Sequence, residues 1–211
     1  MAAIHKVRQG EHISSIAEQY GFPDWRVIWE GGQNAALRER RVNPDVLYPG
    51  DEIVIPDKRI KEEPVPTGKL HVFRVSRSPL KLRLCIKDFD NKPIGGLACE
   101  VEIDGSARQV STDGQGFLNF DIPPNTKEGR LRIDSMGIDV PLKIGHMDPA
   151  EEDSGWVARL VNLGYHHGQL GDMTDEWLPI AIEEFQCDHG LKVTGLLDDA
   201  TRSKLREVHG S

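Results

Sequence analysis

Two adjacent histidines, His166 and His167, and the nearby Asp172 are the residues whose types best suit metal chemistry. Imidazole nitrogens and carboxylate oxygens are zinc ligands, so the group invites comparison with a zinc peptidase. The spacing does not fit, because Met173 stands where the pattern needs an acid and the chain has no His-Glu-x-x-His helix. We therefore expect a solvated pair of histidines and no metal site.

The cysteines and paired acids give no catalytic arrangement either. No CxxC pair occurs, and Cys85 and Cys99 fall on opposite faces of their predicted strands, so a disulfide between them is not expected. Cys187 has no transpeptidase signature around it, and Glu183-Glu184 is typical of a solvated helix face. Phosphate-binding loops and dinucleotide fingerprints are also missing. The sequence thus predicts no catalytic residue and no cofactor.

Charge is concentrated at one end of the chain. The 211 residues include 26 Lys and Arg against 34 Asp and Glu, a net charge of −8. Residues 148–211 hold 5 of the basic and 13 of the acidic residues, so they carry all of the net negative charge. An acidic chain without a basic patch is a poor partner for nucleic acid, which is bound by phosphate neutralisation.

Hydropathy argues against membrane insertion. No run approaches the roughly 18 apolar residues of a membrane-spanning helix. Residues 1–10 lack the apolar core of a secretory signal peptide. We expect a protein that is cytoplasmic as synthesised; if it acts in the periplasm or outside the cell, an injection apparatus would have to carry it there.

Composition divides the chain into three folded segments, at 1–58, 70–145 and 150–211. Residues 59–69, with two prolines among charged residues, predict a semi-extended linker. A second break lies at 145–153, where alternating apolar residues give way to helical spacing. The expected fold class is multidomain α+β.

The first segment is predicted to form a strand, two helices and a closing strand. A short strand at 4–7 precedes apolar residues at helical spacing over 13–20. Asp24 is a natural cap for the second helix. The Pro49-Gly50 pair predicts a type II turn before a strand at 53–55.

These pieces resemble the LysM domain, a small glycan-binding module. Two features depart from the family pattern: Glu11-His12 replaces the usual Asp-Thr, and residues 31–41 form a longer and more basic stretch. The resemblance is carried by Val7-Arg8-Gln9-Gly10-Glu11-His12-Ile13, Ile16-Ala17, Asn34, Leu47, Pro49-Gly50-Asp51 and Ile53-Val54-Ile55-Pro56.

The LysM resemblance implies a groove for N-acetylglucosamine chains between the loop after the first strand and the loop before the second. Apolar side chains would face the sugar, and backbone groups would hold the acetamido groups. The alternative is a LysM fold retained only for interaction with protein. On the glycan-binding interpretation, the groove would be lined by Gly10, Glu11, His12, Ile13, Val46, Leu47 and Tyr48.

The middle segment is predicted to be a small β-sandwich, because short alternating strands are separated by turn residues. Its turn at 112–117 is similar to that of transthyretin-like and carboxypeptidase-regulatory-like repeats, which implies a transthyretin/Ig-like fold. Either a rigid spacer or a docking surface for a partner protein would suit such a unit. The expected strands are 81–87, 98–103, 107–112, 117–122, 130–134 and 138–144.

The last segment is predicted to contain three helices and resembles the three-helix peptidoglycan-binding domain found beside many wall hydrolases. The resemblance implies a core position for Phe185 and a backbone-satisfying role for Gln186. The usual Asp-Gly before the second helix is altered to Leu170-Gly171-Asp172. The matching pieces are Leu160-Val161-Asn162-Leu163-Gly164-Tyr165, Ala181-Ile182-Glu183-Glu184-Phe185-Gln186, Gly190-Leu191-Lys192-Val193-Thr194-Gly195 and Asp198-Asp199-Ala200-Thr201.

The order of the three segments resembles accessory proteins of phage-tail-like contractile injection and type VI secretion systems. This implies a non-enzymatic protein that binds peptidoglycan glycan strands and has a secretion-system spike, baseplate or effector protein as a further partner. The rival interpretation is an interaction adaptor, a chaperone or a spike-associated component whose modules bind protein. A wall hydrolase without a recognisable site is the third.

Overall fold

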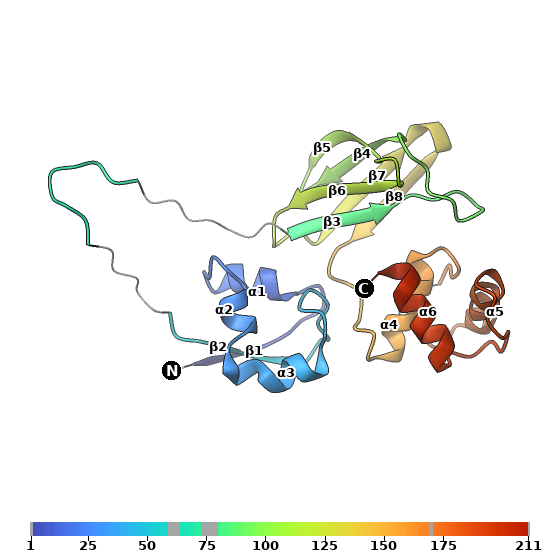
Figure 1. Cartoon of the computed structure of the whole chain (residues 1–211), viewed down its shortest axis with the longest axis horizontal. Helices are drawn as coiled ribbons and strands as arrows, with labels where there is room; N and C mark the ends of the chain where they lie inside the picture. The colour runs from blue at the N-terminus through green and yellow to red at the C-terminus, as the bar shows by residue number, and fades with distance from the viewer. Residues whose placement is uncertain (1, 59–63, 73–79, 169–170, 211) are drawn as a thin grey trace. The chain divides into compact units, whose positions relative to one another are not determined.

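The computed structural model describes residues 2–58, 64–72, 80–168 and 171–210 (Figure 1). Parts of three predicted features lie outside these residues: 59–63 of the linker, 73–79 of the middle segment, and Leu170 before the second C-terminal helix. The described chain groups into two compact units. One contains 2–3, 13–31 and the described part of 54–144, and the other contains 4–12, 32–53 and the described part of 145–210. The prediction that three segments fold independently stays a prediction.

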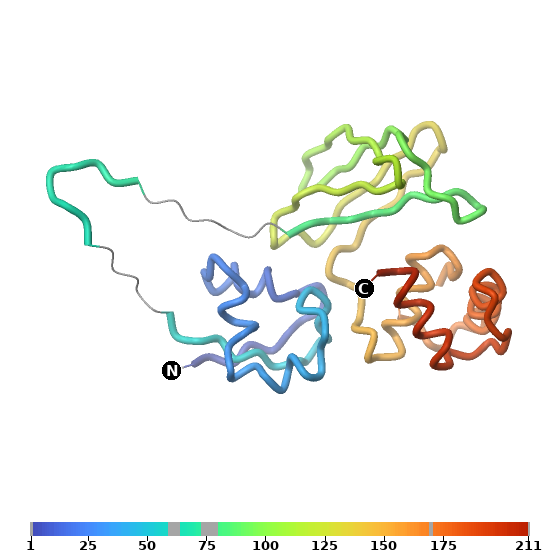
Figure 2. Tube along the Cα trace, in the orientation of Figure 1, coloured from blue at the N-terminus to red at the C-terminus, as the bar shows by residue number. Residues whose placement is uncertain are grey.

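The first segment has the expected strands and helices and one more helix. Strands β1 and β2, one near each end of the segment, form a two-stranded sheet, and their traces can be followed in Figure 2. The additional helix, α3, lies in the basic stretch that departs from the LysM pattern, and Leu37 is its one fully buried residue. The elements are β1 (Ala3–Lys6), α1 (Ile13–Gln19), α2 (Arg26–Trp29), η1 (Gly32–Asn34), α3 (Ala35–Arg40) and β2 (Glu52–Ile55).

Two glycines in this segment adopt the left-handed backbone that their turns require. Gly21, with a φ of +68°, ends α1 and donates its N–H to Glu18 O at 2.8 Å. Gly50, with a φ of +97°, is the third residue of the turn closed by Asp51 N donating to Tyr48 O at 3.0 Å. The type II turn predicted from the Pro-Gly pair is therefore confirmed.

The middle segment consists of two packed sheets, as the alternation predicts. One pairs β3 with β6, and the other has the strand order β5-β4-β7-β8. Buried side chains from β4, β6 and β7, among them Val101, Leu118 and Leu131, form the core between the sheets. The strands are β3 (Leu80–Cys85), β4 (Ala98–Ile103), β5 (Ser106–Ser111), β6 (Phe117–Ile122), β7 (Glu128–Ile133) and β8 (Ile138–Lys143), with η2 (Asp134–Met136) before β8.

The turn between β5 and β6 is fixed by a side chain and a close backbone approach. Asp113 Oδ1 accepts from Gln115 N and Phe117 N, each at 2.9 Å. Gly116 has a φ of +78°, and a Cβ there would lie 2.8 Å from Ile86 O, so only glycine fits. Cys85 and Cys99 are both free thiols, and Cys99 is buried on the apolar face, as expected.

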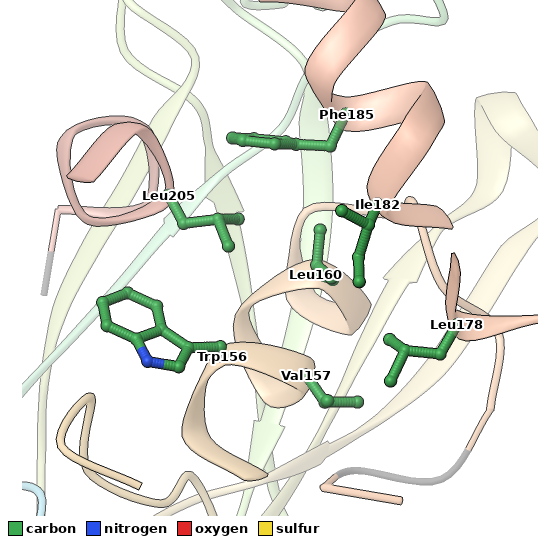
Figure 3. Close-up of a cluster of buried hydrophobic side chains, with 7 residues drawn as sticks. All are labelled: Trp156, Val157, Leu160, Leu178, Ile182, Phe185 and Leu205. Atoms are coloured by element: carbon green, nitrogen blue, oxygen red, sulfur yellow. The ribbon is translucent and has the colours of Figure 1, made fainter. Parts of the chain in front are cut away.

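The last segment is a three-helix module, comprising α4 (Asp153–Asn162), α5 (Leu178–Asp188) and α6 (Asp199–His209). Asp198 caps α6 by accepting from Thr201 N at 2.9 Å. Pro179 stands at the second helical position of α5, because Leu178 begins the helix. Figure 3 shows the core side chains turned toward one another from all three helices: Trp156, Val157, Leu160, Leu178, Ile182, Phe185 and Leu205.

The helices of the described ranges are all short. Among the residues whose structure is described, no helix is both long enough and apolar enough to cross a membrane.

Candidate functional site

The loop after β1 is held by the carboxylate of Glu11. Its Oε2 accepts from Arg8 N at 2.9 Å and lies 2.8 Å from Nε2 of His5. His5 is buried, and the Glu11 side chain is 14% exposed. Glu11, predicted to line a sugar groove, thus uses its carboxylate within the loop.

The next two predicted groove residues are also turned inward. His12 is 2% exposed, with Nδ1 4.0 Å from Asp45 Oδ1, and Ile13 is fully buried at the start of α1. Gly10 is buried too and has a φ of +82°. A ligand at this loop would meet backbone atoms in preference to the side chains of His12 and Ile13.

The loop before β2 presents more side-chain surface. Val46 and Tyr48 are half-buried, whereas Leu47 is buried. Tyr48 N donates to Asp51 Oδ2 at 3.1 Å, and the guanidinium of Arg41 lies 5.4 Å from the Tyr48 ring centroid. Val46 and Tyr48 are therefore the two predicted groove residues whose side chains can reach a ligand.

Asp51 connects the loop before β2 to the end of α3 and to the loop after β1. Its buried carboxylate pairs with Arg41 Nε at 2.9 Å and with Arg40 Nη2 at 2.7 Å. Two backbone bonds, Val7 N to Asp51 O and Gly50 N to Val7 O, each measure 2.8 Å. The loops after β1 and before β2 are thus brought side by side, as the groove hypothesis requires. Whether sugar binds between them stays a prediction.

In the C-terminal module, Gln186 is a buried structural residue, as predicted. Its Oε1 accepts from Thr194 N at 2.7 Å and Gly195 N at 3.1 Å. Its Nε2 donates to Leu196 O at 3.0 Å and Thr201 Oγ1 at 2.8 Å. One amide therefore fastens the loop after α5 to the first turn of α6.

The histidine pair is not solvated as a pair, which corrects the sequence-based expectation. His167 is exposed, but His166 is only 3% exposed, and its Nε2 lies 3.4 Å from Asp175 Oδ2. Asp175 and Gly168 both lie close to the His166 ring. A Cβ on Gly168 would be 2.5 Å from His166 Nε2 and 2.5 Å from Asp175 Oδ2. In the described part of the chain, no group of three or more His, Cys, Asp or Glu could hold a metal ion.

Hydrogen bonds near this pair favour the ionised form of the Asp172 carboxylate. The hydroxyl and backbone N–H of Thr174 donate to Asp172 Oδ1 at 2.7 and 2.8 Å, and these bonds hold the pKa of Asp172 below its usual value. Asp175 Oδ1 accepts from Trp177 N at 2.9 Å. The segment before α5 is thus acidic and locally ordered.

An exposed apolar surface beside α5 was missed by the sequence reasoning. Trp177 is 62% exposed, and Met173 and Ile180 are 44% and 45% exposed. The core residues of α5 recur at the spacing Leu178, Ala181, Ile182 and Phe185. Trp177 and Ile180 fall outside that set, so the same spacing could have identified them as outward-facing.

Comparison with known proteins bears on this C-terminal module. Residues 157–205 match the family described as "Putative peptidoglycan binding domain", a range that runs from α4 to α6. No curated protein and no solved structure matches the chain. The helical module that was predicted from the Phe-Gln, Gly-Leu and Thr-Gly series is accordingly similar to a peptidoglycan-binding domain.

Proposed function

We propose that the protein binds peptidoglycan through its C-terminal helical module. The observation that carries this proposal is the family match over 157–205. The residues that define the resemblance fold as such a module needs: Phe185 lies in the core, and Gln186 fastens the loop between α5 and α6.

The proposal extends to a second, LysM-like glycan-binding module at the N-terminus. Val46 and Tyr48 would contact the sugar, and backbone groups near Gly10 would hold acetamido groups. The module's near balance of charge supports contact that is apolar and backbone-mediated, so binding would depend little on salt. Chitin oligomers would bind weakly, with affinity that grows with chain length.

The protein would bind without cleaving, as an accessory of a phage-tail-like contractile injection or type VI secretion system. Support for a non-enzymatic role comes from the residues themselves, since His166 packs against Asp175 instead of facing a substrate site. The secretion-system context rests on the order of modules, and a spike, baseplate or effector protein would be the protein partner.

One observation favours the alternative of a protein-interaction adaptor, chaperone or spike-associated component. Glu11 and His12 differ from the LysM pattern, and both are engaged inside the segment. If the LysM-like segment serves protein contact, its fold must be kept, but the residues of a sugar groove need not be.

Co-sedimentation of the full chain with purified sacculi tests the proposal. We expect the protein in the pellet, and its retention in the supernatant would favour the adaptor. For the N-terminal groove, titration of the full chain with chitin oligomers should shift NMR signals of the loops around Gly10 and Tyr48. Tyr48→Ala should abolish those shifts, whereas Phe89→Ala, an exposed aromatic in the β-sandwich, should leave them unchanged.

A further inference from the structure

The outward face of α5 carries an unusual combination of apolar and acidic side chains. Trp177 and Ile180 are 62% and 45% exposed. Glu183 and Glu184 follow at the spacing that places them on the same side of the helix as Ile180. We call Glu176, Trp177, Ile180, Glu183 and Glu184 the α5 outer face. Large exposed apolar residues that gather in one place mark contact surfaces.

The backbone of Trp177 is held by hydrogen bonds on both sides. Asp175 Oδ1 accepts from Trp177 N at 2.9 Å, and Ala181 N donates to Trp177 O at 3.1 Å. Asp175 is in turn fixed against the buried His166, 3.4 Å away. Because the backbone of Trp177 is already held, a ligand that contacts the ring loses less binding free energy to ordering of the protein.

The loop after α5 borders this face on one side. A Cβ on Gly195 would lie 3.1 Å from Glu183 Oε1 and 3.5 Å from Pro179 O, so the loop backbone runs directly against the helix. Leu196, the next residue, is largely exposed. The α5 outer face is therefore part of a wider surface that includes the loop fastened by Gln186.

The charges of this surface select the ligand. Lys192 is the one Lys or Arg between Gly171 and Asp199. Within the described part of the chain, Glu176, Glu183 and Glu184 enter no ion pair. Exposed carboxylates attract an ammonium group by charge, and the exposed indole of Trp177 on the same face can add a cation–π contact.

We propose that the α5 outer face binds the free side-chain amine of the diamino acid in peptidoglycan stem peptides. This inference rests on the proposed function and names the part of the polymer that the C-terminal module would contact. Stem peptides that are not cross-linked keep such a primary amine, and it is their only cationic group. The glycan hydroxyls and the peptide carboxylates offer no matching charge.

Acetylation of the sacculi tests the inference without altering the protein. Treatment with acetic anhydride converts the free amines to neutral amides and leaves the glycan in place. We expect the full chain to bind acetylated sacculi about three- to fivefold more weakly than untreated sacculi, and added salt to weaken only the untreated binding. Equal binding to both preparations would overturn the inference and leave the proposed function standing.

Variants of the full chain provide the matching test from the side of the protein. Trp177→Ala and the double variant Glu183→Gln/Glu184→Gln should each bind untreated sacculi about three- to fivefold more weakly and no longer distinguish acetylated from untreated sacculi. Phe89→Ala and Glu39→Gln, which replace exposed residues elsewhere, serve as matched controls. Variants that keep the full preference for untreated sacculi would contradict the inference. If the unaltered chain binds neither preparation, the proposed function itself is wrong and the inference falls with it.

Discussion

Nε2 of His5 lies 2.8 Å from Oε2 of Glu11, which joins a buried strand residue to the loop that follows it. The same carboxylate oxygen accepts from Arg8 N at 2.9 Å. In place of the Asp-Thr pair usual in the LysM pattern, the chain thus has an acid that fastens its own loop. The departure from the pattern at Glu11 thus has a structural explanation, because its carboxylate is used inside the loop.

Replacement of Glu11 should loosen this loop. Glu11→Ala removes the acceptor for both His5 and Arg8 N, and we expect a loss of about 1–2 kcal/mol of local stability. Hydrogen exchange of the Arg8 amide in the full chain measures it. Glu39→Ala, at an exposed site, is the control. An unchanged exchange rate at Arg8 would contradict the role given to the carboxylate.

Replacement of Gln186 should destabilise the C-terminal module much more. Gln186→Leu leaves the N–H groups of Thr194 and Gly195 and the carbonyl of Leu196 without their buried partner. We expect a loss of at least about 3 kcal/mol, seen as a lower melting temperature by circular dichroism. Cys187→Ala, at the exposed neighbouring position, should change stability by less than about 0.5 kcal/mol. Equal melting of the two variants would refute the structural role.

Stability should fall as the pH drops from about 6.5 to about 4, because burial and the neighbouring charge of Arg159 lower the pKa of His209 to about 4. In this window the unfolded chain protonates His209 and the folded chain does not, so protons favour unfolding. The full effect is at most about 3 kcal/mol. Below this window, protonation of Asp172 and Asp198, whose pKa values are lowered by hydrogen bonds, removes further stability.

Urea denaturation at several pH values checks this dependence. His209→Gln should flatten the loss between pH 6.5 and 4, whereas His167→Gln, an exposed histidine of the same module, should not. A profile for His209→Gln that parallels the unaltered chain would show that another group causes the loss.

We expect no hydrolysis of peptidoglycan. His166 is buried against Asp175, and His167 points to solvent, so the two rings do not form a common site. Soluble muropeptides released from sacculi should not exceed those of a heat-treated sample. Release that disappears in His166→Ala or His167→Ala would establish an enzyme instead.

The secondary structure was predictable wherever burial repeats with a regular period. Leu178, Ala181, Ile182 and Phe185 are buried on one side of α5, and the strand alternation around Cys99 and Val101 is reproduced in β4. Helix α3 was missed because Leu37 is its one fully buried residue, which leaves no repeat to detect.

The candidate sites were less predictable, because side-chain burial depends on residues distant in sequence. Adjacent histidines gave no sign that Asp175 and Gly168 would enclose only one of them. Gly10, Glu11 and His12 lie on the loop after β1, but spacing alone could not tell that Glu11 bonds His5. Trp177 is the exception, since its position outside the buried repeat of α5 was available from the start.

The edges of the four-stranded sheet bear on how the chain behaves when many copies are crowded together. The two outermost strands of that sheet are β5 and β8. Pro141 lies within β8 and has no N–H to offer a further strand, and β5 has the polar sequence Ser-Ala-Arg-Gln-Val-Ser with Arg108 at its centre. Strand-by-strand growth into fibrils is therefore disfavoured at both edges. Crowded copies of the chain are therefore hindered from joining strand to strand through this four-stranded sheet.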